Sequence, residues 1–97
     1  MELTGSPVVA INRAVAMAEA EGPAAGLALL DAAAADARLV QYQPYWAARA
    51  ELLARTGDAA GAEEAYQLAI GLEADPVVRR FLQERRDALR RESRPRE

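Results

Sequence analysis

The 97-residue chain contains no cysteine and no histidine. It therefore cannot form a disulfide, and it lacks the thiolate and imidazole groups that most often act as nucleophiles, general bases and zinc ligands. The acidic pair Glu63-Glu64 is no substitute, because adjacent side chains on a helix diverge by about 100°. The sequence predicts a non-enzymatic protein with no catalytic residue, no cofactor and no bound metal.

Long apolar runs are absent as well. No stretch of the sequence approaches the ~20 apolar residues that are needed to cross a bilayer. No apolar segment follows a basic start, as it would in a secretory signal peptide. We therefore expect a soluble, cytoplasmic protein with no membrane partner.

Lysine is also missing, so all twelve basic residues are arginines, and they are unevenly distributed. Residues 79–97 contain eight arginines and four acidic residues, whereas residues 1–78 contain four arginines and eleven acidic residues. The formal charges of the two parts are therefore +4 and −7, and the acidic part can hold its own basic end. Because acidic residues interrupt the arginines, a solvated helix face is favoured over a nucleic-acid contact.

Alanine is abundant instead, and it has the highest helix propensity of all residues. β-Branched residues are few and do not alternate with polar ones as they would in strands. Ser6-Pro7 and Asp75-Pro76 each combine a helix cap with a proline. We expect an all-α domain over residues 1–91 and a disordered tail over 92–97. The five predicted helices are about 7–21, 23–35, 44–56, 58–73 and 76–91.

The segments GPAAG at residues 22–26 and GDAAG at residues 57–61 are near-copies, and each joins two predicted helices. A helix–turn–helix unit with a period in the mid-thirties resembles the tetratricopeptide repeat (TPR). Arg49 departs from that pattern, since it stands where leucine is usual. The residues that match it are Trp46, Ala50, Ala62, Tyr66 and Ala69 in the second unit and, more weakly, Ala14, Gly26, Leu30 and Ala33 in the first.

The sequence thus predicts two TPR-like hairpins and a C-terminal capping helix, an arrangement of the α-α superhelix type. Small residues at the helix contacts allow close packing, and stacked hairpins need a cap at the end of the array. The apolar side of the capping helix is expected to consist of Val78, Phe81, Leu82 and Leu89. On its polar side, Asp87 and Arg91 are spaced for an ion pair.

Two arginines are candidates for binding a protein partner. Arg13 and Arg49 occupy matching positions in the two units, near the predicted helix–helix seam. In one interpretation each guanidinium is partly buried and tied to a carboxylate or a helix C-terminal carbonyl of its own chain. In the other, both arginines are presented to an acidic group of the partner.

Trp46 is a third candidate, because it lies in an aromatic cluster with Tyr42 and Tyr45. Such a cluster either seals the junction of two hairpins or forms a binding hot spot. The last three candidates, Glu19, Glu51 and Arg55, belong to the predicted inner surface of the array. The other members of that surface are Ile11, Val15 and Ala47.

Three segments together resemble one known module: SPVVAINRAVAMAEAEGPAAGLALLDA, YQPYWAARAELLARTGDAAGAEEAYQLAI and RRFLQERRDAL. They are similar to the C-terminal, TPR-like extension of a group of bacterial RNA polymerase sigma factors of the extracytoplasmic-function (ECF) type. The resemblance covers nearly the whole chain. In that family, the regions that bind polymerase and read the promoter precede this module. The resemblance therefore implies that promoter DNA is contacted only through N-terminal regions of a parent protein.

The function implied by the resemblance is a protein-interaction and regulatory domain in transcription initiation. Such a domain would act by helix packing against other sigma domains, against RNA polymerase or against a regulator. The alternative is a stand-alone TPR-like scaffold that binds a peptide or protein partner. Formation of a homo-oligomer by the isolated domain, through an exposed end of the stack, is also left open.

Overall fold

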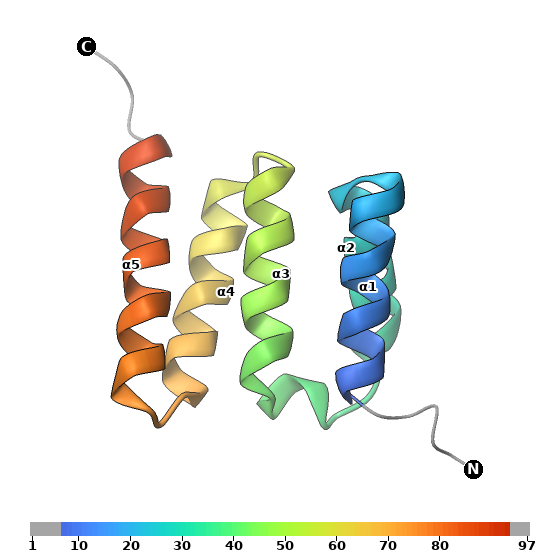
Figure 1. The fold of residues 1–97 in the computed structure, drawn as a ribbon, viewed down its shortest axis with the longest axis horizontal. Helices are drawn as coiled ribbons and strands as arrows, with labels where there is room; N and C mark the ends of the chain where they lie inside the picture. Colours follow the sequence, from blue (N-terminus) through green and yellow to red (C-terminus); the bar gives the residue numbers. More distant parts are fainter. Residues whose placement is uncertain (1–6, 94–97) are drawn as a thin grey trace.

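The computed structural model describes residues 7–93, which contain five α-helices and no strand. Helices α1 and α2 form one antiparallel hairpin, α3 and α4 form a second, and α5 packs against α4 (Figure 1). The all-α class and the five helices expected from the sequence are thus confirmed. The elements are α1 Pro7–Glu21, α2 Pro23–Ala33, the 3₁₀ turn η2 Leu39–Gln41, α3 Gln43–Arg55, α4 Ala59–Leu72 and α5 Pro76–Ser93.

Some helix ends differ from the predicted ones by one or two residues. α2 stops at Ala33 instead of residue 35, because the backbone N–H of Ala34 bonds to the Asp31 carbonyl and the chain turns there. α5 continues to Ser93, since arginines in its last turn favour the negative end of the helix dipole. Residues 92 and 93, which were predicted as part of the tail, are therefore helical. Residues 94–97 and the predicted cap at Ser6 lie outside the described residues.

Local capping fixes where two of the helices start. An Oδ1 atom of Asp58 accepts a hydrogen bond from the Gly61 backbone N–H at 2.9 Å. Asp75 Oδ1 accepts one from the Val77 backbone N–H at 2.9 Å. Each bond satisfies a backbone donor of the first turn that has no partner within the helix. Gly57, in the turn between α3 and α4, has a φ of +92°, a conformation that favours glycine.

Alanine and glycine occupy the points where the helices cross. Ala14, Ala50 and Ala62 are all 0% exposed. At Gly26, an added Cβ would lie 2.6 Å from the carbonyl oxygen of Ala14 and 2.9 Å from Leu52 Cδ1. Side chains of this size let helix axes approach toward about 8 Å rather than 10 Å. Larger residues then fill the space between crossings: Leu30, Leu39, Tyr45, Tyr66, Ile70 and Leu82 are buried.

Aromatic side chains seal the junction between the two hairpins. Trp46 packs against both hydrophobic clusters, the first formed by α1, α2, η2 and α3 and the second by α3, α4 and α5. Its Nε1 donates a hydrogen bond to the Val40 carbonyl at 3.0 Å, and its ring meets that of Tyr45 edge-on, with centroids 5.0 Å apart. Leu39, which lies between the predicted helices 23–35 and 44–56, is 1% exposed and joins the first cluster. The connection between the hairpins is therefore part of the core.

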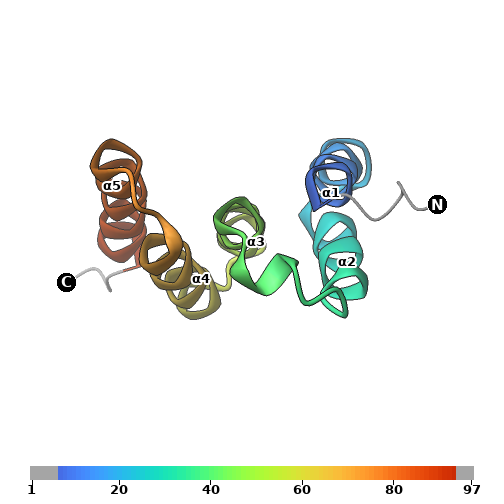
Figure 2. The same cartoon turned by 90° about the horizontal axis from the view of Figure 1, so that it is seen from below.

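Viewed from below, the helices form a curved row (Figure 2). Helices α1, α3 and α5 lie along one side of the row, and α2 and α4 lie along the other. The three helices on the first side run in the same direction, as the colours in Figure 1 show. Residues at equivalent turns of α1, α3 and α5 therefore lie at similar heights along the row.

One prediction about α5 is wrong. Phe81 was expected on the apolar side of this helix, but its side chain is 58% exposed. Leu82 is 2% exposed, whereas Val78 and Leu89 are half-buried. Because successive residues are about 100° apart around a helix, Phe81 falls outside the stripe centred on Leu82. α5 therefore presents an aromatic residue to solvent.

Replacing Gly26 by alanine is expected to lower the free energy of unfolding by about 1–2 kcal/mol. Overpacking of this kind costs about 1–3 kcal/mol, and the higher helix propensity of alanine returns about 0.5–1 kcal/mol. Gly71→Ala is the matched control, because nothing lies within 4 Å of an added Cβ at this helical position. It should stabilise the fold slightly. Urea denaturation of both variants tests this, and a Gly26→Ala variant as stable as the parent would contradict it.

Candidate functional site

A face formed by α1, α3 and α5 contains a chain of four charged side chains. Arg55 Nη1 lies 3.3 Å from Glu19 Oε2 of α1, and Arg55 Nη2 lies 3.1 Å from Glu51 Oε2 of its own helix. The other carboxylate oxygen of Glu51 lies 3.1 Å from Arg85 Nη2 on α5. We call these four residues the ion chain. It links three helices and contains equal numbers of positive and negative groups.

Each charge in the ion chain has an opposite charge beside it. Glu51 and Arg55 share one side of α3 because they are four residues apart. Hydrogen bonds to Glu19 and then to Glu51 raise the pKa of Arg55. The pKa of Arg85 is also raised, first by a hydrogen bond with the Tyr66 side chain and further by the charge of Glu51. Both guanidinium groups therefore remain charged at every physiological pH.

The ion chain is accessible to water. The exposed fractions of its side chains range from 39% for Glu51 to 66% for Glu19. Ion pairs with this degree of exposure contribute little to stability, because water and salt screen them. An incoming carboxylate or guanidinium can therefore replace a member of the chain at small cost.

The same face is apolar one helical turn toward the N-terminal ends of its helices. Glu19, Glu51 and Arg85 lie on different helices, and each has an apolar residue four positions earlier in the sequence. This spacing puts both residues of a pair on one side of the helix. These apolar residues are Val15 on α1, Ala47 on α3 and Phe81 on α5. Val15 is 41% exposed, and Val8, a further two turns along α1, is 49% exposed. We call the ion chain together with these four residues the α1–α3–α5 face.

Contacts between α4 and α5 hold Arg85 in position. Arg90 Nη2 lies 2.7 Å from Glu63 Oε2, and Arg86 Nη1 donates to Gln67 Oε1 at 3.1 Å. Hydrogen bonding to Arg90 lowers the pKa of Glu63 below its ordinary value. These contacts fix the register of α5 on α4 and thereby the position of Arg85.

The ion pair expected between Asp87 and Arg91 is not the one that forms. Asp87 Oδ1 lies instead 3.4 Å from Arg86 Nε and 3.9 Å from Arg90 Nη1. Two arginines nearer in space thus share this carboxylate.

The structure separates the six residues that the sequence suggested for partner binding. Glu19, Glu51 and Arg55 come together in the ion chain, whereas Trp46 and Arg49 lie on another side of α3. Arg49 Nη1 is 2.6 Å from Asp31 Oδ1 of α2, and its side chain is only 26% exposed. Arg49 therefore ties the two hairpins together, in agreement with the first interpretation of this residue. Trp46 and Arg49 also line a hollow of about 310 Å³ between α3 and α4.

Arg13 does not behave like Arg49, although the two were expected to be equivalent. Its side chain is exposed, and it forms no ion pair with any residue from 7 to 93. The physical reason is position in the row. The partner of Arg49 comes from α2 of the preceding hairpin, and no described hairpin precedes α1.

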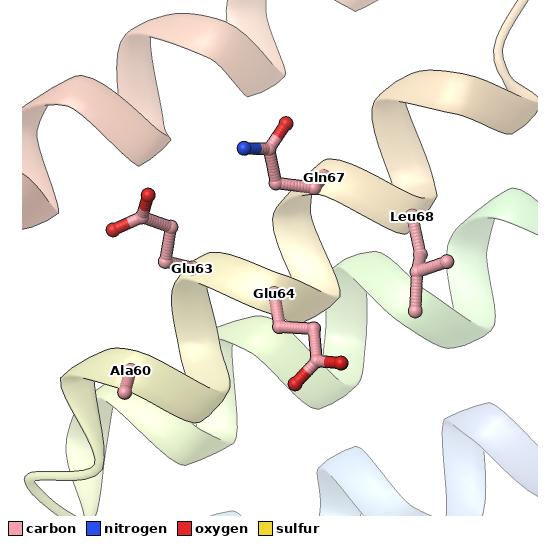
Figure 3. Close-up of a pocket in the computed structure, with 5 residues that line it drawn as sticks. All are labelled: Ala60, Glu63, Glu64, Gln67 and Leu68. Carbon is pink, nitrogen blue, oxygen red and sulfur yellow. The ribbon is translucent and has the colours of Figure 1, made fainter.

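The acidic residues of α4 do not converge. In the surface hollow of Figure 3, Glu63 and Gln67 point to the α5 side of the helix, while Glu64 and Leu68 point to the opposite side. All five lining residues come from α4. Across residues 7–93, no three acidic side chains are placed to hold a metal ion.

Sequence reasoning missed three residues of the α1–α3–α5 face: Val8, Phe81 and Arg85. Arg85 is one of six arginines in α5, and only its position opposite Glu51 distinguishes it from the others. Phe81 was assigned to the core. The spacing of four residues between Phe81 and Arg85 was the available signal, because it places them on one side of the helix.

Comparison with known proteins gives one relative of uncharacterized function. No family model matches the chain, and no solved structure matches it. The chain is similar to an uncharacterized protein of Rhizobium meliloti (strain 1021), with 37% identity over 87 residues. This match covers 90% of the chain and 20% of the relative, so the chain spans about a fifth of the length of that protein. Separately, no helix within residues 7–93 is long and apolar enough to cross a membrane.

Replacing Glu63 by glutamine is expected to destabilise the protein in a pH-dependent way. Because the folded state lowers the pKa of Glu63, its carboxylate stabilises the fold above the pKa of the unfolded chain. That stabilisation is lost as the pH falls through the lowered pKa of the folded state. The difference in urea midpoint between variant and parent should therefore be largest near neutral pH and should disappear once the pH has fallen below the lowered pKa of Glu63.

The neighbouring exposed residue provides the control for this experiment. Glu64→Gln makes the same chemical change, but Glu64 has no ion-pair partner within residues 7–93. Its midpoint should follow that of the parent at every pH. A Glu63→Gln effect that is the same at neutral and acid pH would show that charge pairing with Arg90 is not its cause.

Proposed function

We propose that this chain is a non-enzymatic protein-interaction domain with TPR-like architecture. In this proposal it regulates transcription initiation in the cytoplasm as part of a bacterial ECF-type sigma factor. The α1–α3–α5 face packs against another sigma domain, against RNA polymerase or against a regulator. Promoter DNA is contacted by other regions of the parent protein.

Equivalent packing in the two hairpins supports the TPR-like architecture. At two positions of each hairpin, small residues 36 positions apart in the sequence have the same environment. Ala14 and Ala50 are both fully buried, and in the second pair Gly26 is buried and Ala62 is fully buried. Small residues repeated at such a period, in hairpins that stack on one another, are typical of TPR units.

The relative supports placing the domain within a larger protein. The similar segment accounts for 20% of the length of that relative, so most of the relative lies outside it. A sigma factor provides such surroundings, because polymerase binding and promoter recognition reside in separate regions. The segments NRAVA and GPAAGLALLD carry the resemblance to the sigma-factor extension.

The composition of the α1–α3–α5 face is the observation that carries the interaction role. Protein interfaces combine an apolar centre with polar surroundings, and this face has exposed apolar residues beside charged ones. Phe81 is its most prominent member, since more than half of an aromatic side chain is in water. Aromatic residues and arginine are enriched among the residues that dominate binding energy. The face includes both, in Phe81, Arg55 and Arg85.

Binding of the fluorescently labelled chain to core RNA polymerase, or to the remaining sigma regions of the parent protein, tests this proposal. We expect the anisotropy to rise on titration with at least one of these probes. Phe81→Asp should weaken the binding at least about ten-fold, because it removes the aromatic contact and adds a charge. Arg80→Glu is the control, since Arg80 is exposed on α5 but is not part of the face.

Two results would contradict the proposal in different ways. Absence of binding to both probes at concentrations of about 50 μM, the range of weak complexes, would contradict the sigma-factor role and favour a stand-alone scaffold. Binding that Phe81→Asp and Arg80→Glu affect equally would preserve that role and remove the α1–α3–α5 face from it.

A further inference from the structure

We infer that the hollow between α3 and α4 binds an arginine side chain of a partner protein. The guanidinium group lies beside Trp46 and pairs with the carboxylates of Asp58 and Glu64, which line the same hollow. This hollow lies on another side of α3 from the ion chain. The inference therefore concerns a second site and does not rest on the proposed function.

The hollow is a groove between the two helices of the second hairpin. In each helix the lining residues are three or four positions apart, so they form one stripe along the helix. The groove has a volume of about 310 Å³, at the lower end of the range for ligand pockets, and this size suits one large side chain. The two stripes are Trp46, Arg49 and Leu53 on α3, and Gly61, Glu64 and Leu68 on α4.

Trp46 provides an aromatic surface that is already fixed in place. Its Nε1 donates a hydrogen bond to the Val40 carbonyl at 3.0 Å, and its ring meets that of Tyr45 edge-on. The side chain is only half-buried, so part of it remains accessible where it lines the hollow. Among aromatic residues, tryptophan attracts a cation most strongly. A positively charged group therefore finds a prepared surface here.

The two carboxylates that line the hollow have no positive partner. The Oδ1 atom of Asp58 accepts the capping hydrogen bond from Gly61, and Asp58 forms no ion pair within residues 7–93. Glu64 points away from α5 and its arginines (Figure 3), and it is likewise unpaired in that part of the chain. The positive charge of Arg49 is taken by Asp31, at 2.6 Å. Two unmatched negative charges therefore remain in the lining.

The lining selects the chemistry of the side chain that enters. An acidic side chain would meet two like charges, and a purely apolar one would take both carboxylates out of water without a partner. A guanidinium group avoids both costs, because it stacks flat on an aromatic ring and has five N–H donors for carboxylate oxygens. The apolar stem of an arginine can pack against Leu53 and Leu68. A lysine ammonium is compact and strongly hydrated, so it uses the aromatic surface less well.

The surroundings of the hollow favour an arginine within a protein chain over the free amino acid. Leu68 and Leu72 lie four residues apart on α4 and continue its stripe beyond the hollow, with exposed fractions of 42% and 40%. Residues that flank an arginine in a partner chain can cover these leucines. Free arginine would leave them uncovered, and its own carboxylate would approach the two carboxylates of the lining.

Titration of the chain with blocked tripeptides tests the inference, and Trp46 is the natural reporter because it is the single tryptophan. We expect leucine-arginine-leucine to change its fluorescence with a Kd of about 0.1–1 mM. In the matched control peptide, citrulline replaces arginine and keeps nearly the same shape without the charge. It should bind at least about ten-fold more weakly, because charge-assisted hydrogen bonds and the cation–π contact are lost. The lysine peptide and free arginine should also bind more weakly than the arginine peptide.

Variants of the two carboxylates assign the binding to the hollow. Glu64→Gln and Asp58→Asn should each weaken binding of the arginine peptide about three- to five-fold, the range of exposed ion pairs. Asparagine caps a helix as well as aspartate does, so Asp58→Asn keeps the start of α4 intact. Glu84→Gln is the matched control, since Glu84 is an exposed residue of α5 without an ion pair in residues 7–93. Its Kd should equal that of the parent, and circular dichroism should show equal helix content in all variants.

Several outcomes would overturn the inference. One is the absence of a saturable fluorescence change up to about 10 mM arginine peptide. Others are equal affinities for the arginine peptide and for citrulline, lysine or free arginine, or unchanged affinity in both carboxylate variants. Equal weakening by Glu84→Gln would also overturn it, because the effect would then come from overall charge. No polymerase or sigma region is present, so these outcomes are independent of the test of the proposed function.

Discussion

The lack of side-chain volume where the helices cross is the constraint on which the rest of the structure depends. At Gly26 the backbones of α1 and α2 are so close, with Leu52 of α3 beside them, that a single Cβ has no room. Ala50 and Ala62 occupy the corresponding places in the second hairpin and are fully buried. Alanine contributes little apolar area of its own, so the favourable burial comes from larger residues between the crossings. Close crossings and intervening large side chains together make a row of helices instead of a globule around one centre.

In a row of helices, each helix keeps a side that no other helix covers. Contacts with other molecules are therefore made on these surfaces. α3, in the middle, shows this most clearly. Its Glu51 and Arg55 belong to the ion chain, while Arg49, on another side, binds Asp31 of α2. A single helix thus contributes both to holding the hairpins together and to the face proposed for binding.

The sequence predicts those features that depend on neighbouring residues. The helices, the cap at Asp58 and the small residues at the crossings follow from local signals, and the structure contains them. Features that depend on the position of a helix within the row could not be predicted from the local sequence. Arg13 and Arg49 have the same local sequence context, but within residues 7–93 only Arg49 follows a hairpin that supplies a carboxylate. Leu39 is buried because the connection folds back onto the first cluster, which no local pattern indicates.

The ion chain also has a mechanical consequence. It links α1, α3 and α5 on one side of the row through exposed ion pairs. Dissolved ions screen such pairs, with a Debye length of about 8 Å at physiological ionic strength. The alanine crossings beneath are dry and do not respond to ionic strength. Added salt is therefore expected to weaken the links between α1, α3 and α5 on this face and to leave the buried crossings unchanged.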